Sequence, residues 1–316
     1  MATVRQIPKG AEGFSPAPVS RVINNYEHVS HDVREQVIRS ARELGGFRDS
    51  RNIAILISAN VTFWSYSGCM LAALLDKLKK RNYHELIVTE NSTHLLHEHL
   101  LDGAISMIMH SGIERLWPKR QSIPLICINS RPRHISGIYS VFCNDRQGIT
   151  MALDHLWRLG HVRIGYLENS AEKDQRNLNL MRRQEAYHQW MDAHHLSPVV
   201  MRQAEELVGT IGSERLTAIL SIGEMHGLRT WSILRNAGYR IPEDLSLVCF
   251  SNPSLAFGNM PDLTSIEQDY SKMASRVIDQ LERLIAGKRI EDLEIDYRFI
   301  PGGSIAPPPM DPAGVR

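Results

Sequence analysis

Residues 15–25 read Ser-Pro-Ala-Pro-Val-Ser-Arg-Val-Ile-Asn-Asn, a pattern typical of a short helix. Ser15 is a favourable N-cap because its hydroxyl accepts a hydrogen bond from a backbone N–H of the first turn. Pro16 then falls at the first helical position, where a missing N–H costs nothing. Val19 and Val22 recur at helical spacing and form an apolar stripe. The pattern therefore predicts a short helix with one apolar and one polar face.

A second helix is predicted directly after the first, which is too short to be stable alone in water. Ser30 is an N-cap candidate, and the apolar residues of 32–44 recur at helical spacing, which predicts an amphipathic helix. Gly45 and Gly46 are expected to end this helix. The two helices can bury their apolar stripes against each other. The polar face of the first helix, which carries Ser20 and Arg21, is then left free to meet DNA.

This block resembles the headpiece of the LacI/GalR (lactose-repressor) family of bacterial transcription regulators. The matching pattern is the recognition-helix stretch, the Asn24-Asn25 turn, and Val29-Ser30 with Arg34. The resemblance implies that Arg21 reaches into the major groove, where a guanidinium can bond both acceptors of a guanine. Outside this motif, Arg21 would be read as a solvated surface charge. The DNA-binding residues that the resemblance implies are Ser15, Pro16, Ala17, Ser20, Arg21 and Asn24.

Two features depart from the family pattern. Pro8 lies in the segment expected to form the first headpiece helix, where an interior proline costs on the order of 3 kcal/mol. The family also joins headpiece and core through a longer segment that contains a hinge helix with a leucine wedge. Here only residues 45–52 separate Leu44 from the first core strand, and Phe47 is their only large apolar side chain. We expect a headpiece over residues 1–46 and a shortened hinge over 47–52.

The composition is that of an ordinary globular protein. The 316 residues are 43% hydrophobic and 22% charged, with a net charge of +1. Residues 1–52 contain eight Lys or Arg against six Asp or Glu, a small excess for a DNA reader. We therefore expect a homodimer in which both headpieces contact DNA.

Several other classes of protein find no support in the sequence. No apolar run is long enough to span a membrane, and the polar N-terminus has no signal-peptide core, so we expect a cytoplasmic protein. The scattered cysteines are expected to be free thiols. The histidines at 94, 97 and 99 lack the spacing of a metal site, and no phosphate loop, nucleophile elbow or catalytic carboxylate pair is present. We expect no metal, cofactor or catalytic residue.

From residue 53 onward the pattern alternates strands and helices, which predicts an α/β fold with doubly wound parallel sheets. Apolar strand runs are expected at 53–57, 85–89, 104–109, 124–128, 137–142, 162–167, 218–221 and 245–250. Helices are expected at 69–80, 95–101, 148–159, 181–194 and 225–237. Two such cycles in tandem predict two subdomains, a common arrangement for binding a small ligand.

The LacI/GalR resemblance extends through this core. Asp145 with Gly148 and the stretch 155–164, then 236–247 and 261–266, are similar to the family's core signatures. The resemblance implies a periplasmic-binding-protein-like core whose chain crosses between the subdomains three times. We expect one subdomain over 53–148 and 266–289, the other over 149–265 and 290–303, and a mobile Pro- and Gly-rich tail over 304–316.

The effector site matches the family less well. Arg183 occupies the position of the family's effector arginine, where a guanidinium can bind hydroxyls or a carboxylate; the alternative is a surface helix charge. Trp64 and Tyr66 either form an aromatic platform for a sugar ring or pack as ordinary loop residues. The polar residues that bind sugar hydroxyls in the family are replaced in this sequence. Either the effector is not a typical sugar or the pocket is degenerate. The expected effector contacts are Trp64, Tyr66, Asp145, Arg183, Glu224 and Ser251.

The sequence thus predicts a DNA-binding transcription regulator of the repressor type. Its affinity for an operator is expected to change when it binds a small-molecule effector such as a sugar or sugar derivative. The alternative is a ligand-binding protein of the periplasmic class with decayed or absent DNA binding. An enzyme on a doubly wound fold is a further rival, which the missing catalytic constellation opposes.

Overall fold

The computed structural model describes residues 16–23, 29–43, 50–59, 66–108, 113, 117, 123–130, 132, 137–168, 178–223, 226–250 and 262–310. The chain divides into two compact units. Unit 1 comprises Met1–Val61, Met70–Val141 and Ala274–Leu293, and unit 2 comprises Thr62–Cys69, Phe142–Met273 and Glu294–Arg316.

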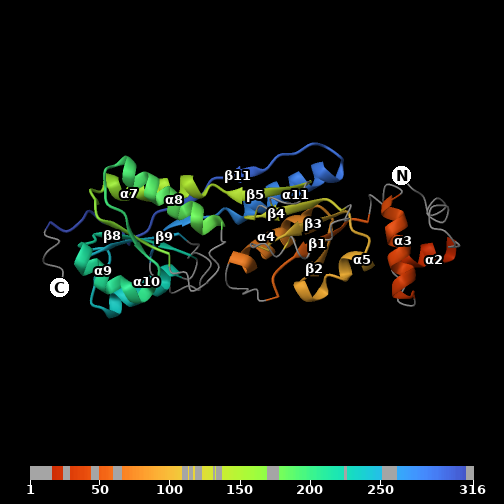
Figure 1. Cartoon of the computed structure of the whole chain (residues 1–316), viewed down its shortest axis with the longest axis horizontal. Coiled ribbons are helices and arrows are strands. Elements are labelled where there is room, and N and C mark those ends of the chain that lie inside the picture. Colours follow the sequence, from red (N-terminus) through yellow and green to blue (C-terminus); the bar gives the residue numbers. More distant parts are fainter. Residues whose placement is uncertain are drawn as a thin grey trace. The chain divides into compact units, whose positions relative to one another are not determined.

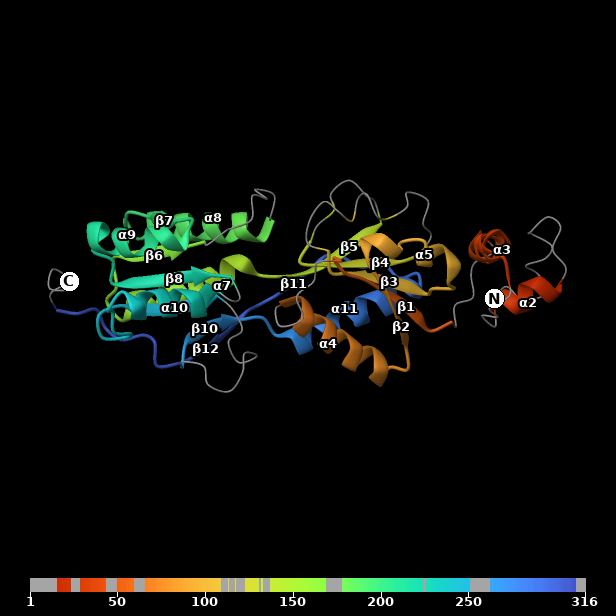
Figure 2. The ribbon, with the colours of Figure 1, turned by 90° about the horizontal axis from the view of Figure 1, so that it is seen from below.

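Unit 1 is built on a six-stranded sheet with the strand order β11-β5-β4-β3-β1-β2. Strand β1 pairs in parallel with β2 and β3, and β4 pairs in parallel with β3 and β5. Helices α4 and α11 lie on one face of the sheet and α5 on the other (Figure 2). The elements are β1 (Asn52–Leu56), α4 (Tyr66–Lys80), β2 (His84–Val88), α5 (Leu95–Glu98), β3 (Gly103–Ser106), β4 (Leu125–Ile128), β5 (Ile138–Cys143), α11 (Tyr270–Ile285) and β11 (Leu293–Ile295), with a 3-10 turn, η1, at Glu90–Ser92.

Unit 2 contains the second six-stranded sheet, of order β12-β10-β9-β8-β6-β7. Its pairs are parallel except β10 with β12, which is antiparallel. Helices α7 and α8 lie on one side of the sheet, and α9 and α10 on the other (Figure 1). The elements are α7 (Asp145–Arg158), β6 (Ile164–Leu167), α8 (Leu178–Ala193), β7 (Val199–Met201), η2 (Ala204–Glu206), α9 (Leu207–Glu214), β8 (Ala218–Ile222), α10 (His226–Asn236), β9 (Ser246–Phe250), β10 (Thr264–Glu267) and β12 (Arg298–Ile300).

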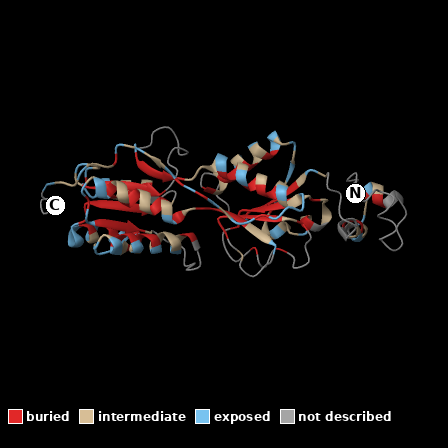
Figure 3. Ribbon diagram, turned by 90° about the horizontal axis from the view of Figure 1, so that it is seen from above, coloured by how far each residue is buried: buried red, intermediate tan, exposed pale blue. Residues whose placement is uncertain are grey.

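The central strands are buried on both faces, as continuous apolar runs predict for parallel sheets covered by helices (Figure 3). In unit 1, Gly103 of β3 lets α11 approach, because a Cβ at this position would lie 2.8 Å from Cδ1 of Leu281. In unit 2, α9 and α10 share one apolar cluster with β8 and β9. The predicted α/β fold with two doubly wound parallel sheets is confirmed.

Two headpiece helices precede the first sheet. They are α2 (Pro16–Ile23) and α3 (His31–Glu43), close to the helices predicted from residues 15–25 and 32–44. The backbone carbonyl of Ser30 accepts a hydrogen bond from the Arg34 N–H at 3.0 Å, as expected for the residue before the helix.

Some expectations about the core are wrong. The tail does not become mobile at residue 304: Ser304 is 3% exposed, and its hydroxyl donates to the Leu247 carbonyl at 2.5 Å. The Ala306 N–H donates to Ser246 Oγ at 3.0 Å, so the chain continues along the sheet past residue 303. The start of α7 also belongs to unit 2, whose boundary falls after Val141 rather than after residue 148.

Short edge elements escaped the sequence analysis. Strands β7, β11 and β12 have three residues each, too few to show a periodic pattern. Helix α9 contains two glycines, which weaken the helical signal.

The four cysteines are free. Burial raises the pKa of Cys127 and of Cys249 to about 12, so both thiols are protonated and unreactive at neutral pH. No helix in the described ranges is both long and apolar enough to cross a membrane.

Candidate functional site

The headpiece helices are held together by a small apolar cluster, which we call the headpiece cluster: Val19, Val22, Val37 and Ile38, each at most 3% exposed. Val19 and Val22 lie one turn apart on α2, and Val37 and Ile38 are neighbours on α3. The apolar stripe predicted for the first helix is therefore the face that packs against the second.

The other face of α2 carries the residues predicted to meet DNA. Arg21 is exposed and Ser20 is half-buried. Pro16 and Ala17 form the first turn of α2, but their side chains lie outside the described part of the chain, as do Ser15 and Asn24 as whole residues. The helix thus presents Arg21 to solvent from the side opposite the headpiece cluster.

A buried polar cluster in unit 2 joins Arg183, Asp145 and Tyr297. Arg183 Nε donates to Asp145 Oδ1 at 2.7 Å, and Nη2 donates to the Tyr297 hydroxyl at 2.9 Å. The Tyr297 hydroxyl in turn donates to Asp145 Oδ1 at 3.0 Å. The three side chains come from α8, from the start of α7 and from the residue before β12, so widely separated segments close one ring of hydrogen bonds.

Aromatic rings cover this cluster. The guanidinium carbon of Arg183 lies 4.5 Å from the centroid of the Phe250 ring, and Phe250 packs against Tyr297 at 4.7 Å between centroids. Gly148 makes room for both rings, because a Cβ there would lie 2.8 Å from Cδ2 of Tyr297 and 2.9 Å from Cζ of Phe250.

The electrostatics of the cluster favour a permanently charged arginine. Burial alone lowers the pKa of Arg183, but Tyr297 and Asp145 outweigh it and raise the pKa above its usual value. Burial also raises the pKa of Tyr297 well above 10, so its hydroxyl keeps its proton. The arginine and the carboxylate form a compensated ion pair beside neutral phenols.

One further hydroxyl lies buried in unit 2. The Tyr166 ring packs against Tyr187 at 5.0 Å between centroids, and its hydroxyl has no hydrogen-bond partner in the described part of the protein. Burial raises the pKa of Tyr166 above its usual value, so this hydroxyl is a neutral donor and acceptor.

Comparisons with known proteins cover nearly the whole chain. The transcriptional regulator GalS of Salmonella typhimurium is 27% identical, covering 95% of this chain and 94% of its own length. An HTH-type transcriptional regulator of Lachnoclostridium phytofermentans is 24% identical, covering 88% of this chain and 92% of its own. Residues 153–305 match the family described as periplasmic binding protein-like domain.

The predicted resemblance to the LacI/GalR transcription regulators is confirmed over most of the chain. The fold agrees with that of solved transcription regulators. The regulator CelR in complex with cellobiose has a TM-score of 0.68 at 20% identity, covering 96% of this chain and all of its own. The Lac repressor dimer bound to operator and the anti-inducer ONPF has a TM-score of 0.68 at 19% identity, covering 96% and 99%. At this identity the likeness shows the fold.

The LacI/GalR signature stretches of the core have mainly structural roles here. His161 makes 2.9 Å and 2.8 Å hydrogen bonds to Thr217 Oγ1 and to the Ala306 carbonyl. Thr264 is bonded through its backbone N–H to Ser304 Oγ at 2.8 Å. These contacts join the chain end to the sheet, whereas Asp145 is the signature residue that contacts the arginine.

The expected effector contacts have different outcomes. Asp145 and Arg183 lie together, while Trp64, Glu224 and Ser251 fall outside the described residues. Tyr66 is buried, and its ring packs against Tyr270 at 5.9 Å between centroids. Among the described residues, no group of three His, Cys, Asp or Glu side chains is placed to hold a metal ion.

Sequence reasoning missed Tyr297 and Phe250, which contact Arg183, and the separate buried hydroxyl of Tyr166. Phe250 and Tyr166 are strand residues with the ordinary apolar pattern of a core. Tyr297 belongs to no recognised motif, and no local signal distinguishes it.

Proposed function

We propose that this chain is a transcription regulator that binds operator DNA through α2 and responds to a small polar molecule bound at the Arg183 cluster. The observation that carries the proposal is the exposed Arg21 on a short helix whose opposite face is buried in the headpiece cluster. An arginine held this way can offer two parallel N–H groups to a guanine edge. Such a protein acts in the cytoplasm as a regulator rather than an enzyme.

The names of relatives support the same function. They include the ribose operon repressor of Haemophilus influenzae and the repressor PurR of Mannheimia succiniciproducens. The structurally similar Lac repressor is a dimer bound to operator. A homodimer also fits the small charge excess of one headpiece, since two headpieces double the phosphate contacts.

The DNA half of the proposal is tested with Arg21→Ala. A binding site is first selected from random DNA with the wild-type chain, and gel shifts are measured over a range of salt concentrations. We expect Arg21→Ala to lose about 1–3 kcal/mol of binding free energy and to relax base preference at one position of each half-site. The matched control is Arg202→Ala, which removes an exposed arginine from unit 2. Equal binding by wild type and Arg21→Ala would refute the role given to Arg21.

The ligand half rests on the chemistry of the Arg183 cluster. Because Asp145 already compensates the guanidinium, the groups left for a ligand are hydrogen-bonding rather than net charged, which suits hydroxyl groups. We expect ordinary hexoses to bind weakly, since the usual sugar-gripping residues are replaced. Calorimetry with a panel of sugars and sugar derivatives tests this.

The variant that tests the ligand site must still fold. The double variant Asp145→Asn/Arg183→Gln removes both charges together and leaves no buried charge unpaired. It should abolish binding of any ligand found with the wild type. Micromolar binding of an ordinary hexose that survives in this variant would contradict the site.

A further inference from the structure

Among the described residues, one side chain from outside the headpiece packs against the headpiece cluster. It is Leu100, which follows α5 and is half-buried. Helices α3 and α5 are correspondingly in contact. Val29 and Val33 of the headpiece pack against the same cluster, so Leu100 is one of three half-buried side chains that extend this small core.

The same segment also holds the end of the linker. Asp102 accepts hydrogen bonds from Ser50 N–H at 3.3 Å, from Ser50 Oγ at 2.7 Å and from Arg51 N–H at 2.8 Å. The Leu100 carbonyl accepts a bond from Asn52 Nδ2 at 2.9 Å. Leu100 and Asp102 therefore contact the headpiece and its linker from one short stretch of unit 1.

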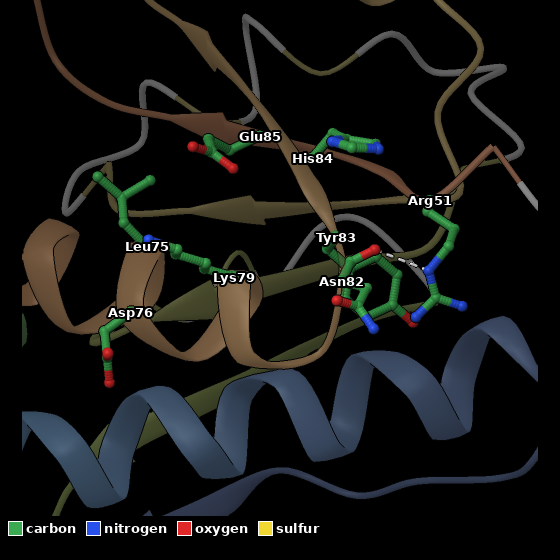
Figure 4. A pocket seen from close by; sticks show the side chains of 8 residues that line it. All are labelled: Arg51, Leu75, Asp76, Lys79, Asn82, Tyr83, His84 and Glu85. Carbon is green, nitrogen blue, oxygen red and sulfur yellow. Dashed lines mark hydrogen bonds between the residues drawn. The ribbon is translucent and has the colours of Figure 1, made fainter.

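Arg51 adds a second attachment at this point. Its Nε donates to the Asn82 carbonyl at 2.8 Å, and its guanidinium carbon lies 4.8 Å from the centroid of the Tyr83 ring (Figure 4). Its backbone takes a left-handed φ of 55°, which turns the chain as it enters β1. The chain is thus fixed to unit 1 from Ser50 onward.

This attachment shortens the connection available to the headpiece. Helix α3 ends at Glu43, so only residues 44–49 separate it from the anchored Ser50. The seven Cα–Cα steps from Glu43 to Ser50 span at most about 25 Å when fully extended. The end of α3 therefore stays within that distance of Ser50.

We propose that Leu100 and Asp102 form a seat that holds the headpiece on unit 1 in the free protein, with the recognition face open. Arg21 is exposed while Leu100 contacts the headpiece cluster, so the seat leaves the DNA-binding side of α2 accessible. A headpiece held in place before binding loses less freedom when it meets DNA. The DNA-binding part of this inference rests on the proposed function; the contact itself does not.

The contact is tested by hydrogen exchange with mass spectrometry on the full chain without DNA. In Leu100→Ala, we expect the amides of α3 to exchange several-fold faster than in wild type, because headpiece opening becomes easier. The matched control is Leu95→Ala: Leu95 is a half-buried leucine of α5 that packs on the unit 1 core cluster, not on the headpiece cluster. It should leave exchange in α3 unchanged. Unchanged exchange in Leu100→Ala would overturn the seat.

A second variant keeps the test decisive if Leu100→Ala destabilises unit 1. Asp102→Ala releases Ser50 and Arg51 and should raise the rate of limited proteolysis within residues 44–49, while Asp244→Ala, at a carboxylate of unit 2, should not. Proteolysis equal to wild type in Asp102→Ala would overturn the linker part of the seat.

The effect on DNA separates the two proposals. On a selected site, Leu100→Ala should bind about threefold to tenfold more weakly than wild type. Tighter binding would show that the seat inhibits the headpiece, which contradicts the inference. If the wild type binds no DNA, the proposed function fails, while the exchange experiment still decides whether the seat exists.

Discussion

Arg183 and Asp145 form a buried ion pair, with 2.7 Å between Nε and Oδ1 and side chains only 11% and 3% exposed. The guanidinium is also bonded to Tyr297 and lies over Phe250. A charge removed from water in this way depends on its partner, because little solvent is available to replace it.

Removing the carboxylate should therefore destabilise unit 2. Asp145→Ala leaves the guanidinium buried and unpaired, and we expect the free energy of unfolding to fall by about 3–5 kcal/mol. Urea denaturation measures the change. The control is Arg240→Ala, which breaks the exposed pair of Arg240 with Asp244 and should have little effect. Equal losses in the two variants would mean that burial does not set the importance of the pair.

Gly148 should tolerate no side chain. Gly148→Ala places a Cβ within 3 Å of Tyr297 and Phe250, so we expect a loss of about 1–3 kcal/mol in unfolding free energy from overpacking. Gly209→Ala is the matched control in helix α9, where a Cβ meets nothing within 4 Å. It should be neutral or stabilise by up to about 1 kcal/mol. Thermal unfolding of both variants compares them, and a stable Gly148→Ala would contradict the tight packing.

Two tyrosine hydroxyls should differ in their contributions to stability. The Tyr187 hydroxyl donates to the Ile164 carbonyl and accepts from the Val199 N–H, each at 2.8 Å, so Tyr187→Phe should cost about 1–3 kcal/mol. The Tyr166 hydroxyl is buried without a partner among the described residues, so Tyr166→Phe should leave stability unchanged or raise it. Chemical denaturation in the absence of ligand distinguishes them. A larger loss for Tyr166→Phe would show that its hydroxyl is bonded in solution.

His161 should make stability fall in mild acid. Burial lowers its pKa below 6.5 in the folded protein, although the bond to the Ala306 carbonyl opposes this shift. The folded state therefore favours the neutral ring; its contribution is present above pH 6.5 and is lost as the pH falls through the lowered folded pKa. His161→Gln should show a weaker fall in stability between pH 7.5 and 5.5 than wild type. Parallel pH profiles of the two proteins would exclude this role.

The short connection between α3 and β1 should produce little DNA bending. Residues 45–51 lie between Leu44 and strand β1 and contain no leucine to act as a wedge. We also expect weak coupling between the ligand site and DNA binding, because so few residues cannot form both a connector and a separate hinge helix. Gel shifts with circularly permuted DNA measure the bend. A strong central bend that disappears in Phe47→Ala would show that this linker replaces the hinge helix.

Local sequence patterns predict the order of the main helices and strands, the two parallel sheets and the resemblance to the LacI/GalR family. These follow from local patterns: an N-cap before α2, apolar strand runs, and signature stretches that keep their spacing. Asp145 and Arg183 could be selected in the same way, because each lies in a recognisable motif.

The residues that contact Asp145 and Arg183 become evident only in the folded chain. Tyr297 comes 114 residues after Arg183, and nothing near it in the chain indicates that its hydroxyl bonds that guanidinium. Leu100 likewise has the sequence context of a core leucine, yet it packs against the headpiece cluster. The tail is a further example, because its composition predicts mobility, whereas Ser304 and Ala306 form hydrogen bonds with strand β9. Periodicity and composition report local preference, whereas contacts between distant segments arise only when the whole chain has folded.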